Sequence, residues 1–306
     1  MGRLVTLRHL KIFVTVCDCG SMTQAAGRLY LAQPAVSLAI RELEEAYGVR
    51  LFDRIARKLY LTPGGRRLEE YARHITALFD EMEREIKDGD GKGGMRIGAS
   101  ITIGTYLMPG LVRRFQAAYP SISVRVAVCN SGDIEGYVLR NEVDFAMIEG
   151  VIHADQLVCR NFMEDELVFV GAPGNPWGNT ATAQELARLP LLLRERGSGA
   201  RELLESALLT HGVRVAPIWE SVSNEALLQA VQAGLGITAL SQRLVWQRLE
   251  EGSLARVTVP DLDLHRAFSF IYHKDKYLTA AMKEFMGLID EAQPDSPPLN
   301  NESAKR

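Results

Sequence analysis

The 306-residue sequence has few cysteines and no long apolar segment. Its four cysteines are too few for a disulfide framework in a chain of this length, which favours a reducing compartment, the cytoplasm. No stretch approaches the roughly 18 apolar residues of a membrane helix, and the apolar run at residues 12–17 is too short for a secretion signal. The composition, 47% hydrophobic and 24% charged, excludes disordered and collagen-like chains. The sequence therefore predicts a cytoplasmic protein of about two domains with no membrane partner.

Patterns typical of catalytic and metal sites are also missing. The six histidines are scattered and form neither a His-x-x-x-His nor a Glu-x-x-His motif, and there is no Gly-x-Ser-x-Gly motif. Cys17 and Cys19 have no second cysteine pair with which to bind zinc. Residues 234–239 resemble a dinucleotide-binding motif, but they follow a predicted helix and begin a strand, the reverse of that motif's context. We therefore expect no enzyme activity, no metal and no cofactor.

Charge is distributed unevenly along the chain. Residues 1–68 contain eleven Lys and Arg against five Asp and Glu, a net charge of +6. The remainder has 24 basic and 33 acidic residues, a net charge of −9. A basic N-terminal segment on an acidic body indicates a polyanionic partner for that segment alone, the alternative being an ordinary solvated surface.

Hydrophobic periodicity predicts that the N-terminal segment forms three helices and then two short strands, over residues 6–19, 21–29, 33–47, 51–54 and 58–61. Residues 21–24 have the Ser-x-x-Gln form of a capping box. Pro34 lies in the first turn of the third helix, where its missing N–H costs nothing. This order of elements is typical of a winged helix-turn-helix, in which the second helix of the motif lies in the major groove of DNA.

The third helix is expected to have one buried and one DNA-facing side. The buried stripe would be Val36, Ile40, Leu43 and Tyr47. The opposite face carries Gln33, Pro34, Ser37 and Arg41. Gln can bond adenine bidentately, Ser can meet a base or a phosphate, and Arg suits guanine or phosphate. In the hairpin, Arg54, Arg57 and Lys58 would approach phosphates or a minor groove; the alternative is a helical hairpin whose polar face and charges are merely solvated.

A long helix of about 25 residues is predicted to begin at Thr62-Pro63-Gly64. Its apolar positions recur at steps of three and four, close to a heptad seam: Leu68, Tyr71, Ile75, Leu78, Met82 and Ile86. A helix with one narrow apolar stripe and charged flanks cannot bury that stripe alone, so we expect it to pair with a second copy of itself. Gly89, Gly91, Gly93 and Gly94 then predict a flexible hinge.

From residue 95 the pattern changes to alternating strands and helices. Strands are predicted over 95–99, 123–129, 143–148, 167–172, 190–193, 236–240 and 267–272. Helices are predicted over 105–118, 182–188, 200–211, 224–233 and 278–291. This order indicates an α/β fold with largely parallel sheets and sites at the strand ends, as one domain or as two small sheets hinged together.

The N-terminal motifs resemble those of LysR-type transcriptional regulators. The matching segments are Ser21-Met22-Thr23-Gln24-Ala25-Ala26, Gln33-Pro34-Ala35-Val36-Ser37, Leu43-Glu44-Glu45-x-x-Gly48-Val49-x-Leu51-Phe52-x-Arg54 and Leu61-Thr62-Pro63-Gly64-Gly65. The resemblance covers about residues 4–290. It implies an all-α winged helix-turn-helix domain, a linker helix with a hinge, an effector-binding domain and a disordered tail, over residues 1–62, 63–92, 93–291 and 292–306.

The resemblance further implies that the effector domain is similar to periplasmic solute-binding proteins, with two α/β subdomains around a cleft. Subdomain I would span about residues 93–165 and 266–291, and subdomain II about 166–265. The chain would cross between them near Asp165 and His265.

The DNA-binding surface implied by the resemblance also includes Ser21, Thr23 and Leu38. The sequence departs from the family at three positions in this region. Ala32 replaces the usual Ser and removes the N-cap of the recognition helix, at a cost of roughly 0.5–2 kcal/mol. Leu38 and Ala39 stand where family members often have basic or Gln residues, so they cannot hydrogen-bond bases but could touch a thymine methyl.

Strand ends and helix starts would line the family's cleft. The residues expected there are Ser100, Ile101, Thr102, Ser131, Glu149, Arg194, Ser198, Gly199, Arg201 and Asn224. Free N–H groups and hydroxyls at helix starts favour a small anion, an inorganic oxyanion or a short carboxylate, with Arg201 and Arg194 supplying charge. The alternative is that these Ser, Thr and Asn residues are only N-caps. Residues 194–201 resemble a segment of a branch tied to sulfur metabolism, although Ala200 replaces its usual Thr.

Three functions are compared. The first is a ligand-responsive regulator that binds double-stranded promoter DNA as a dimer or a dimer-of-dimers tetramer and changes the bend of the DNA. The second is a cytoplasmic solute receptor whose N-terminal half serves only oligomerisation, which a secretion signal would support. The third is an enzyme acting on a small acid, which would need a catalytic constellation. The helix-turn-helix motifs favour the first.

Overall fold

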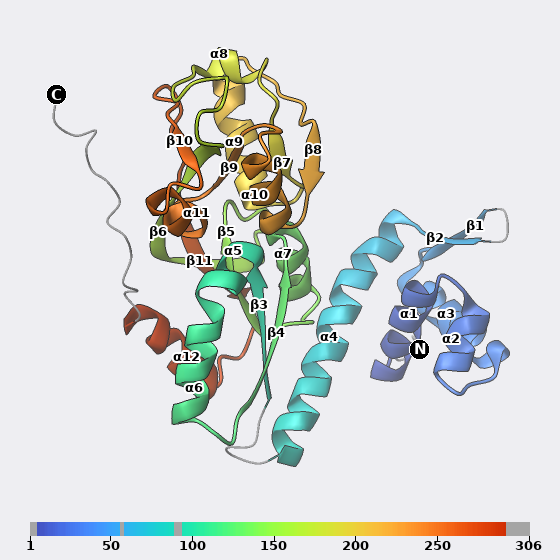
Figure 1. The fold of residues 1–306 in the computed structure, drawn as a ribbon. Coiled ribbons are helices and arrows are strands. Elements are labelled where there is room, and N and C mark those ends of the chain that lie inside the picture. Colours follow the sequence, from blue (N-terminus) through green and yellow to red (C-terminus); the bar gives the residue numbers. More distant parts are fainter. Residues whose placement is uncertain (1–4, 56–57, 89–93, 292–306) are drawn as a thin grey trace. The chain divides into compact units, whose positions relative to one another are not determined.

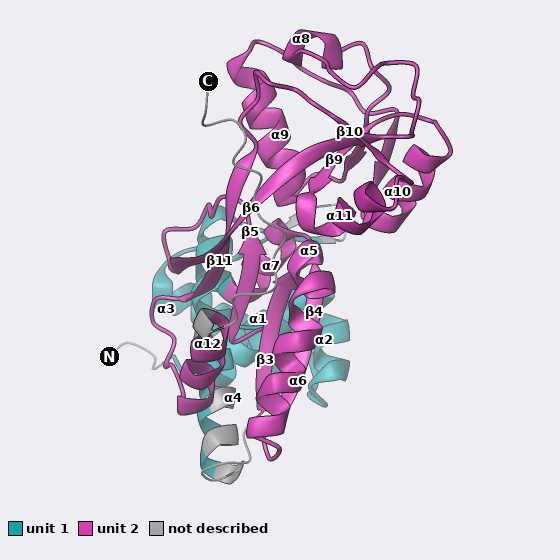
Figure 2. Cartoon of the chain, turned by 60° about the vertical axis from the view of Figure 1, so that its left-hand side comes forward, with its two compact units in different colours: residues 1–93, 139–142 teal, residues 94–138, 143–306 magenta. Residues whose placement is uncertain are grey.

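The computed structural model describes residues 5–55, 58–88 and 94–291. The chain forms two compact units, residues 1–93 with 139–142 and residues 94–138 with 143–306 (Figure 2). Each unit has its own apolar core. The expected disordered tail and most of the expected hinge glycines lie outside the described residues, whereas Gly94 already begins a strand.

The first unit is a bundle of three helices, a hairpin and a long helix (Figure 1). Its elements are α1 (Leu7–Cys19), α2 (Met22–Arg28), α3 (Gln33–Tyr47), β1 (Phe52–Ile55), β2 (Lys58–Leu61) and α4 (Pro63–Asp88). The Ser21 hydroxyl caps α2 by accepting from the Gln24 N–H at 3.4 Å, and Gly48, with a φ of 68°, ends α3. Antiparallel pairing of β1 and β2 forms the predicted wing. These elements confirm the winged helix-turn-helix.

The helical core differs from the expected stripes at a few positions. Tyr47 was expected to be buried but is 49% exposed, because it lies in the last turn of α3 beyond the packed helices. Ala39 is buried at 5% exposure and belongs to the core, so it cannot touch a thymine methyl. In α1 the fully buried residues include Ile12 and Val16, which join Leu10 and Phe13.

The second unit contains a seven-stranded mixed sheet, a two-stranded sheet and surrounding helices (Figure 1). Its strands are β3 (Gly94–Ser100), β4 (Ser123–Cys129), β5 (Phe145–Glu149), β6 (Leu157–Gly171), β7 (Leu192–Arg194), β8 (Trp219–Ser221), β9 (Thr238–Ser241), β10 (Ala255–Val257) and β11 (His265–His273). Its helices are α5 (Ile101–Tyr106), α6 (Met108–Ala118), α7 (Ser131–Leu139), α8 (Ala183–Leu186), α9 (Gly199–Thr210), α10 (Asn224–Gln232), α11 (Gln242–Glu250) and α12 (Ala280–Glu291).

Subdomain I is built on β3, β4, β5 and β11. Helices α6 and α12 lie on one face of this sheet, where Phe115, Phe145 and Phe285 pack together. Helix α7 covers the other face through Ile134 and Val138. Both faces are therefore buried, which explains why every residue of β5 is buried and why β3 is buried at all positions except Gly94 and Arg96.

Subdomain II is built on the second half of β6 with β9, β10, β7 and β8. Strand β6 pairs with β11 over residues 157–166 and then with β9 and β10 over residues 167–171. Asp165 lies opposite Arg266, and Glu166 lies opposite His265. Strand β6 therefore changes partners between Glu166 and Leu167, and His265, the first residue of β11, pairs with Glu166.

The expectation of largely parallel sheets is only partly correct. Strands β3, β4 and β5 are parallel, but β11 is antiparallel to β5, and β6 is antiparallel to β9, β10 and β11. Strand β6 was expected only over residues 167–172, because its first half is polar and largely exposed, as at Arg160, Asn161 and Glu164. Among the described residues, no helix has the length and apolarity needed to span a bilayer.

Candidate functional site

The exposed face of α3 carries most of the expected base-reading side chains. Gln33, Pro34 and Arg41 are exposed, and Leu38 is 47% exposed. The Gln33 amide donates to the Ser37 hydroxyl at 2.8 Å, and Ser37 in turn lies 3.3 Å from the sulfur of Met22. Gln33 and Ser37 are therefore already ordered relative to each other on the surface that would meet a DNA groove.

The other expected DNA contacts lie around this helix. Ser21 is half-buried as the cap of α2, and Thr23, the second residue of that helix, is exposed. Ala32 is the N-cap residue of α3 and offers no side-chain bond, as expected from the sequence. Arg57 lies outside the described residues, as do the side chains of Arg54 and Lys58.

Sequence reasoning missed Tyr30 as a candidate DNA contact. Tyr30 lies in the turn between α2 and α3, with a φ of 55° and an exposure of 96%. A left-handed conformation is uncommon for a residue other than glycine. The signal in the sequence was a large aromatic residue in the middle of a helix-turn-helix turn.

Glu149 lies at the centre of the candidate effector site, at the C-terminal end of β5. It is 2% exposed. The hydroxyls of Ser100 and Thr102, which follow β3, both donate to its carboxylate; the distance from Thr102 is 3.0 Å. The structure therefore brings together three of the residues predicted from strand ends and helix starts.

The loops of the two subdomains meet beside this carboxylate. The Ser131 hydroxyl at the start of α7 donates to the backbone oxygen of Glu149 at 2.9 Å. The N–H of Gly132 donates to the carbonyl of Gly197 in subdomain II at 3.1 Å. At Gly199, the first residue of α9, a Cβ atom would collide with the Glu149 carbonyl. This close approach explains why glycine is needed there. The arrangement with these contacts between the subdomains is called the closed state below.

Arg194 and Arg201, expected to supply positive charge, are paired within subdomain II. Arg194 donates to Glu195 through Nε at 2.8 Å and Nη2 at 2.9 Å, and its Nη1 donates to Asn224 at 2.9 Å. Arg201 donates to Glu205 at 2.6 Å and to the backbone oxygen of Arg194 at 3.0 Å. Both guanidinium groups are buried and tie α9 and α10 to β7.

Arg266 is a buried cation that sequence reasoning missed. It is 7% exposed and donates through Nε to Asp165 at 2.8 Å, while Asp165 also accepts from Ser241 at 2.7 Å. Its Nη1 lies 3.9 Å from the Glu149 carboxylate. Neither Nη1 nor Nη2 has a hydrogen-bond partner among the described residues. The position precedes a predicted strand, so only the pairing of β6 with β11 places it in the site.

Further buried polar atoms of subdomain II lack partners within the described part of the chain. They are Ser198 Oγ, Asn224 Nδ2, Thr238 Oγ1 and Gln242 Oε1. Buried polar groups in folded proteins are almost always hydrogen-bonded, and each exception calls for an explanation. Ser198 and Asn224 are among the expected effector contacts and start α9 and α10. Their unused donors and acceptors fit a polar ligand.

His153 links the two subdomains at the edge of the site. One ring nitrogen lies 2.8 Å from Glu202 on α9, and the other lies 3.2 Å from Glu135 on α7. Hydrogen bonds to Glu202 and then to Glu135 raise the pKa of His153 above its usual value, because both carboxylates stabilise the protonated ring.

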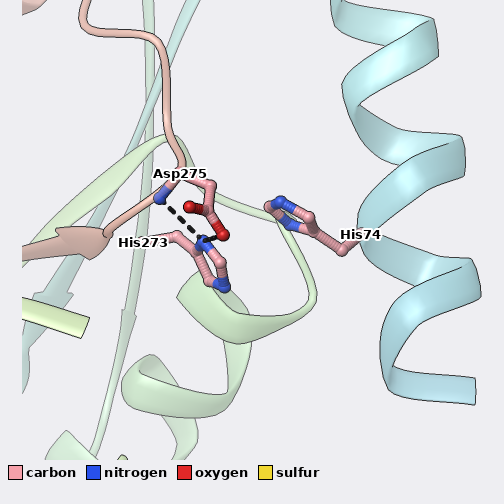
Figure 3. Close-up of side chains that lie close together, drawn as sticks. All are labelled: His74, His273 and Asp275. Carbon is pink, nitrogen blue, oxygen red and sulfur yellow. Dashed lines mark hydrogen bonds and ion pairs between the residues drawn. The ribbon is translucent and has the colours of Figure 1, made fainter. Parts of the chain in front are cut away.

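The cysteines of α1 and the histidine at the end of β11 are the positions considered for a metal ion. Burial raises the pKa of Cys17 to about 12, so its thiol is a poor metal ligand. In the turn after β11, the Asp275 N–H donates to His273 at 3.2 Å (Figure 3). His74, labelled in the same view, lies on α4 of the first unit. Taken unit by unit, the described residues contain no group of three ligands suited to a metal ion.

Comparison with known proteins identifies both parts of the chain. Residues 7–66 match the bacterial regulatory helix-turn-helix protein, lysR family, and residues 88–294 match the LysR substrate binding domain. The chain is 39% identical over 289 residues to the HTH-type transcriptional regulator YeiE of Escherichia coli strain K12, covering 94% of this chain and 98% of YeiE.

Two solved structures share the fold. The regulatory domain of CcmR from Synechocystis PCC6803, in complex with 2-PG, has a TM-score of 0.61 and 25% identity, covering 67% of this chain and 99% of that domain. Full-length CbnR with its target DNA has a TM-score of 0.61 and 20% identity, covering 94% and 99%. The winged helix-turn-helix, the two-subdomain effector unit and these matches together place the chain in the LysR family of transcriptional regulators.

Proposed function

We propose that this regulator senses a small anion, an inorganic oxyanion or a short carboxylate, in the cleft of its effector unit. The observation that carries the proposal is Arg266, a buried arginine with two nitrogens that lack acceptors among the described residues. The hydroxyls of Ser100, Thr102 and Ser198 would be further hydrogen-bond donors to the anion. Of these, Ser198 Oγ has no partner among the described residues. Arginine suits this role because its planar fork can meet two oxygens of one anion. The complex of the CcmR regulatory domain with 2-PG supports a small molecule in this kind of domain.

The residues proposed to line the anion site lie on both subdomains. Those on subdomain I are Ser100, Ile101, Thr102, Ser131 and Glu149, and those on subdomain II are Arg194, Ser198, Gly199, Arg201 and Asn224. Arg266 joins them from the crossing strand. Arg194 and Arg201 are already paired with carboxylates, so their role is to hold the helix starts in place, and Arg266 supplies the charge.

DNA binding is proposed to use the exposed face of α3 and the residues around it. Gln33, Ser37 and Arg41 would read base edges, with Pro34 and Leu38 making apolar contacts. Ser21 and Thr23 on α2 and Arg54, Arg57 and Lys58 of the wing would contact the phosphate backbone. Tyr30 is added to this set because its ring is fully exposed beside α3. The structure of CbnR with its target DNA supports this use of the family's helix-turn-helix.

The protein is proposed to act in the cytoplasm as a dimer or a dimer-of-dimers tetramer. Five apolar residues of α4 are 39–74% exposed, namely Tyr71, Ile75, Leu78, Met82 and Ile86, and Leu68 is partly buried. An apolar stripe of this kind on a helix with a polar opposite face is the seam of a helix pair. Pairing through α4 would set the spacing between two recognition helices. Anion binding would change the closure of the effector unit and thereby the bend of the promoter DNA.

A thermal-shift screen of the full-length chain tests the ligand class. Sulfate, sulfite, thiosulfate, phosphate and short organic acids would be compared with sodium chloride of matched ionic strength. A bound ligand stabilises the folded state by about 2.7 kcal/mol at a hundredfold excess over its Kd. Thr102→Ala and Ser131→Ala should reduce the shift without reducing operator binding in the absence of ligand. Stabilisation by uncharged or cationic compounds alone would rule out an anionic effector.

A further inference from the structure

The buried carboxylate of Glu149 occupies the position where the proposed anion would find its hydroxyl donors. Ser100 and Thr102 each donate to one of its two oxygens. Oε1 also lies 3.9 Å from Arg266 Nη1, the cation of the site. A carboxylate with two hydroxyl donors and a nearby guanidinium has the partners that proteins provide for a bound oxyanion.

Arg266 is not saturated by this arrangement. A guanidinium has five N–H groups, and here Asp165 accepts only from Nε. The contact with Glu149 is too long for a hydrogen bond, and both terminal nitrogens are buried without an acceptor in the described part of the chain. Glu149 therefore satisfies the hydroxyls but not the arginine. An anion that contacted both the hydroxyls and Arg266 would accept hydrogen bonds from Arg266 that the Glu149 carboxylate does not accept.

The backbone of Glu149 is fixed, while its side chain accepts hydrogen bonds from two hydroxyl groups among the described residues. Ser131 donates to its carbonyl, and Gly199 packs against the same carbonyl from subdomain II. Movement at this position is thus confined to side-chain rotation. Rotation would leave the contact between the two subdomains intact.

We propose that Glu149 is an internal competitor for the effector: its carboxylate fills the anion position until an anion displaces it and binds Ser100, Thr102 and Arg266. The inference rests on the proposed function, in which the effector is an anion. Displacement makes the site selective. A ligand replaces the carboxylate only if it accepts hydrogen bonds from both hydroxyls and from Arg266, and this requires a small ligand with at least two adjacent anionic oxygens. Glu149 thus sets the concentration at which the regulator responds.

The test compares anion binding by full-length variants. Glu149→Gln keeps the shape and one oxygen acceptor but removes the competing charge. Two unit charges about 4 Å apart interact strongly in a protein interior, so we expect the Kd for sulfate, measured by calorimetry at matched ionic strength, to fall by at least about tenfold. Glu149→Ala removes the carboxylate altogether, so it should also bind sulfate more tightly than the parent. It replaces Glu149→Gln in the test if that variant does not fold. Arg266→Gln should raise the Kd in either background.

Glu195→Gln is the matched control. It also removes one carboxylate from an arginine pair, but that arginine is Arg194. We expect its sulfate Kd to equal that of the parent, and a decrease here without one in Glu149→Gln would assign the anion to Arg194 and overturn the inference. An unchanged or higher Kd in Glu149→Gln would also overturn it, since Glu149 would then be a bystander or a direct ligand.

Failure of the inference can be told apart from failure of the proposed function. If the parent binds sulfate, phosphate or thiosulfate but Glu149→Gln binds no more tightly, only the competitor role fails. If the parent binds none of them and Glu149→Gln does, the competitor role is supported. If neither protein binds any of these probes, the anionic ligand class fails and the inference fails with it.

Discussion

At the scale of single residues, the charged groups of the effector unit are paired in two different ways. Arg194 and Arg201 make close bonds to carboxylates on their own subdomain. Arg266 and His153 instead connect elements that are distant in sequence. His153 bonds to both Glu135 and Glu202, and Arg266 donates to Asp165 and lies 3.9 Å from Glu149. Groups of the second kind respond to the relative position of the subdomains, so substitutions there should change ligand response before they change folding.

Gln33 tests the base-reading role of α3. It is exposed at the start of the helix and bonded to Ser37, which orients its amide. We expect Gln33→Ala to relax discrimination at one base pair, a loss of roughly 1–3 kcal/mol against the preferred base, measured by gel-shift titration of single-position operator variants. Gln247→Ala, an exposed glutamine on α11, is the control. An unchanged preference among operator variants would disprove base reading by Gln33.

His153 should make the closed state sensitive to pH. Its pKa is raised by Glu202 and Glu135, so the folded state binds the proton more tightly than the unfolded state. The resulting stabilisation is fully present below the ordinary histidine pKa of about 6.5 and is lost as pH rises through the raised value.

Thermal unfolding of the parent and of His153→Gln should therefore differ most in mildly acidic buffer and converge in alkaline buffer. Because the histidine side chain is 60% exposed, solvent screens the interaction and the effect should be small. His211→Gln serves as the control. His211 is the C-cap residue of α9, and its side-chain contacts, Thr210 and Ala207, belong to that helix. A difference that grows with pH would contradict the assigned direction.

At the scale of elements, the sequence predicted the helices and strands whose burial can be read from the apolar pattern of their own residues. The helices of the winged motif, α4, β3, β4 and β5 belong to this group. The structure brings Ser100, Thr102, Ser131 and Glu149 together, and their role in effector binding stays a prediction. Strand β6 and Arg266 could not be found in this way. Their burial depends on pairing between residues such as Asp165 and Arg266, which are about a hundred positions apart.

Leu78 tests the pairing of α4. It lies in the middle of the exposed apolar stripe and is 39% exposed in the single chain. In a helix pair, Leu78→Asp would bury a charge without a partner, which is very costly. We expect loss of dimers in sedimentation velocity and loss of cooperative operator binding.

Leu235→Asp makes the same chemical change at a loop residue that is 47% exposed and should leave assembly unaffected. An unaltered sedimentation profile with unaltered DNA binding in Leu78→Asp would reject the proposed seam.

Gly199 tests closure between the subdomains. A Cβ atom at this position would collide with the backbone oxygen of Glu149, and backbone cannot yield as a side chain does. Gly199→Ala should therefore hold the effector unit open, with faster amide exchange at Gly132, whose N–H bonds to Gly197 across the subdomains. Gly110→Ala in α6 meets nothing within 4 Å and is the matched control. Equal exchange at Gly132 in both variants would show that the contact does not define the closed state.

At the scale of the whole molecule, the uneven charge separates the two binding tasks. The first 68 residues carry +6 and the remainder −9. A basic DNA-binding segment releases counterions on binding, so operator affinity should fall steeply with salt. The acidic remainder repels nucleic acid, and the anion of the proposed function would have to reach its site against that average field. In the proposed site, the cation Arg266 would offset this field locally.

Strand β6 runs through both subdomains and pairs with β11 over residues 157–166, apart from a bulge at Phe162. A loop hinge would let the halves swing freely, but a paired ribbon can only twist, and paired strands tolerate a limited range of twist. Opening and closing should then behave like torsion of an elastic strip, with a restoring force that grows with angle. A sensor built on such a strip returns to its resting geometry by itself once the effector leaves, without help from any other contact.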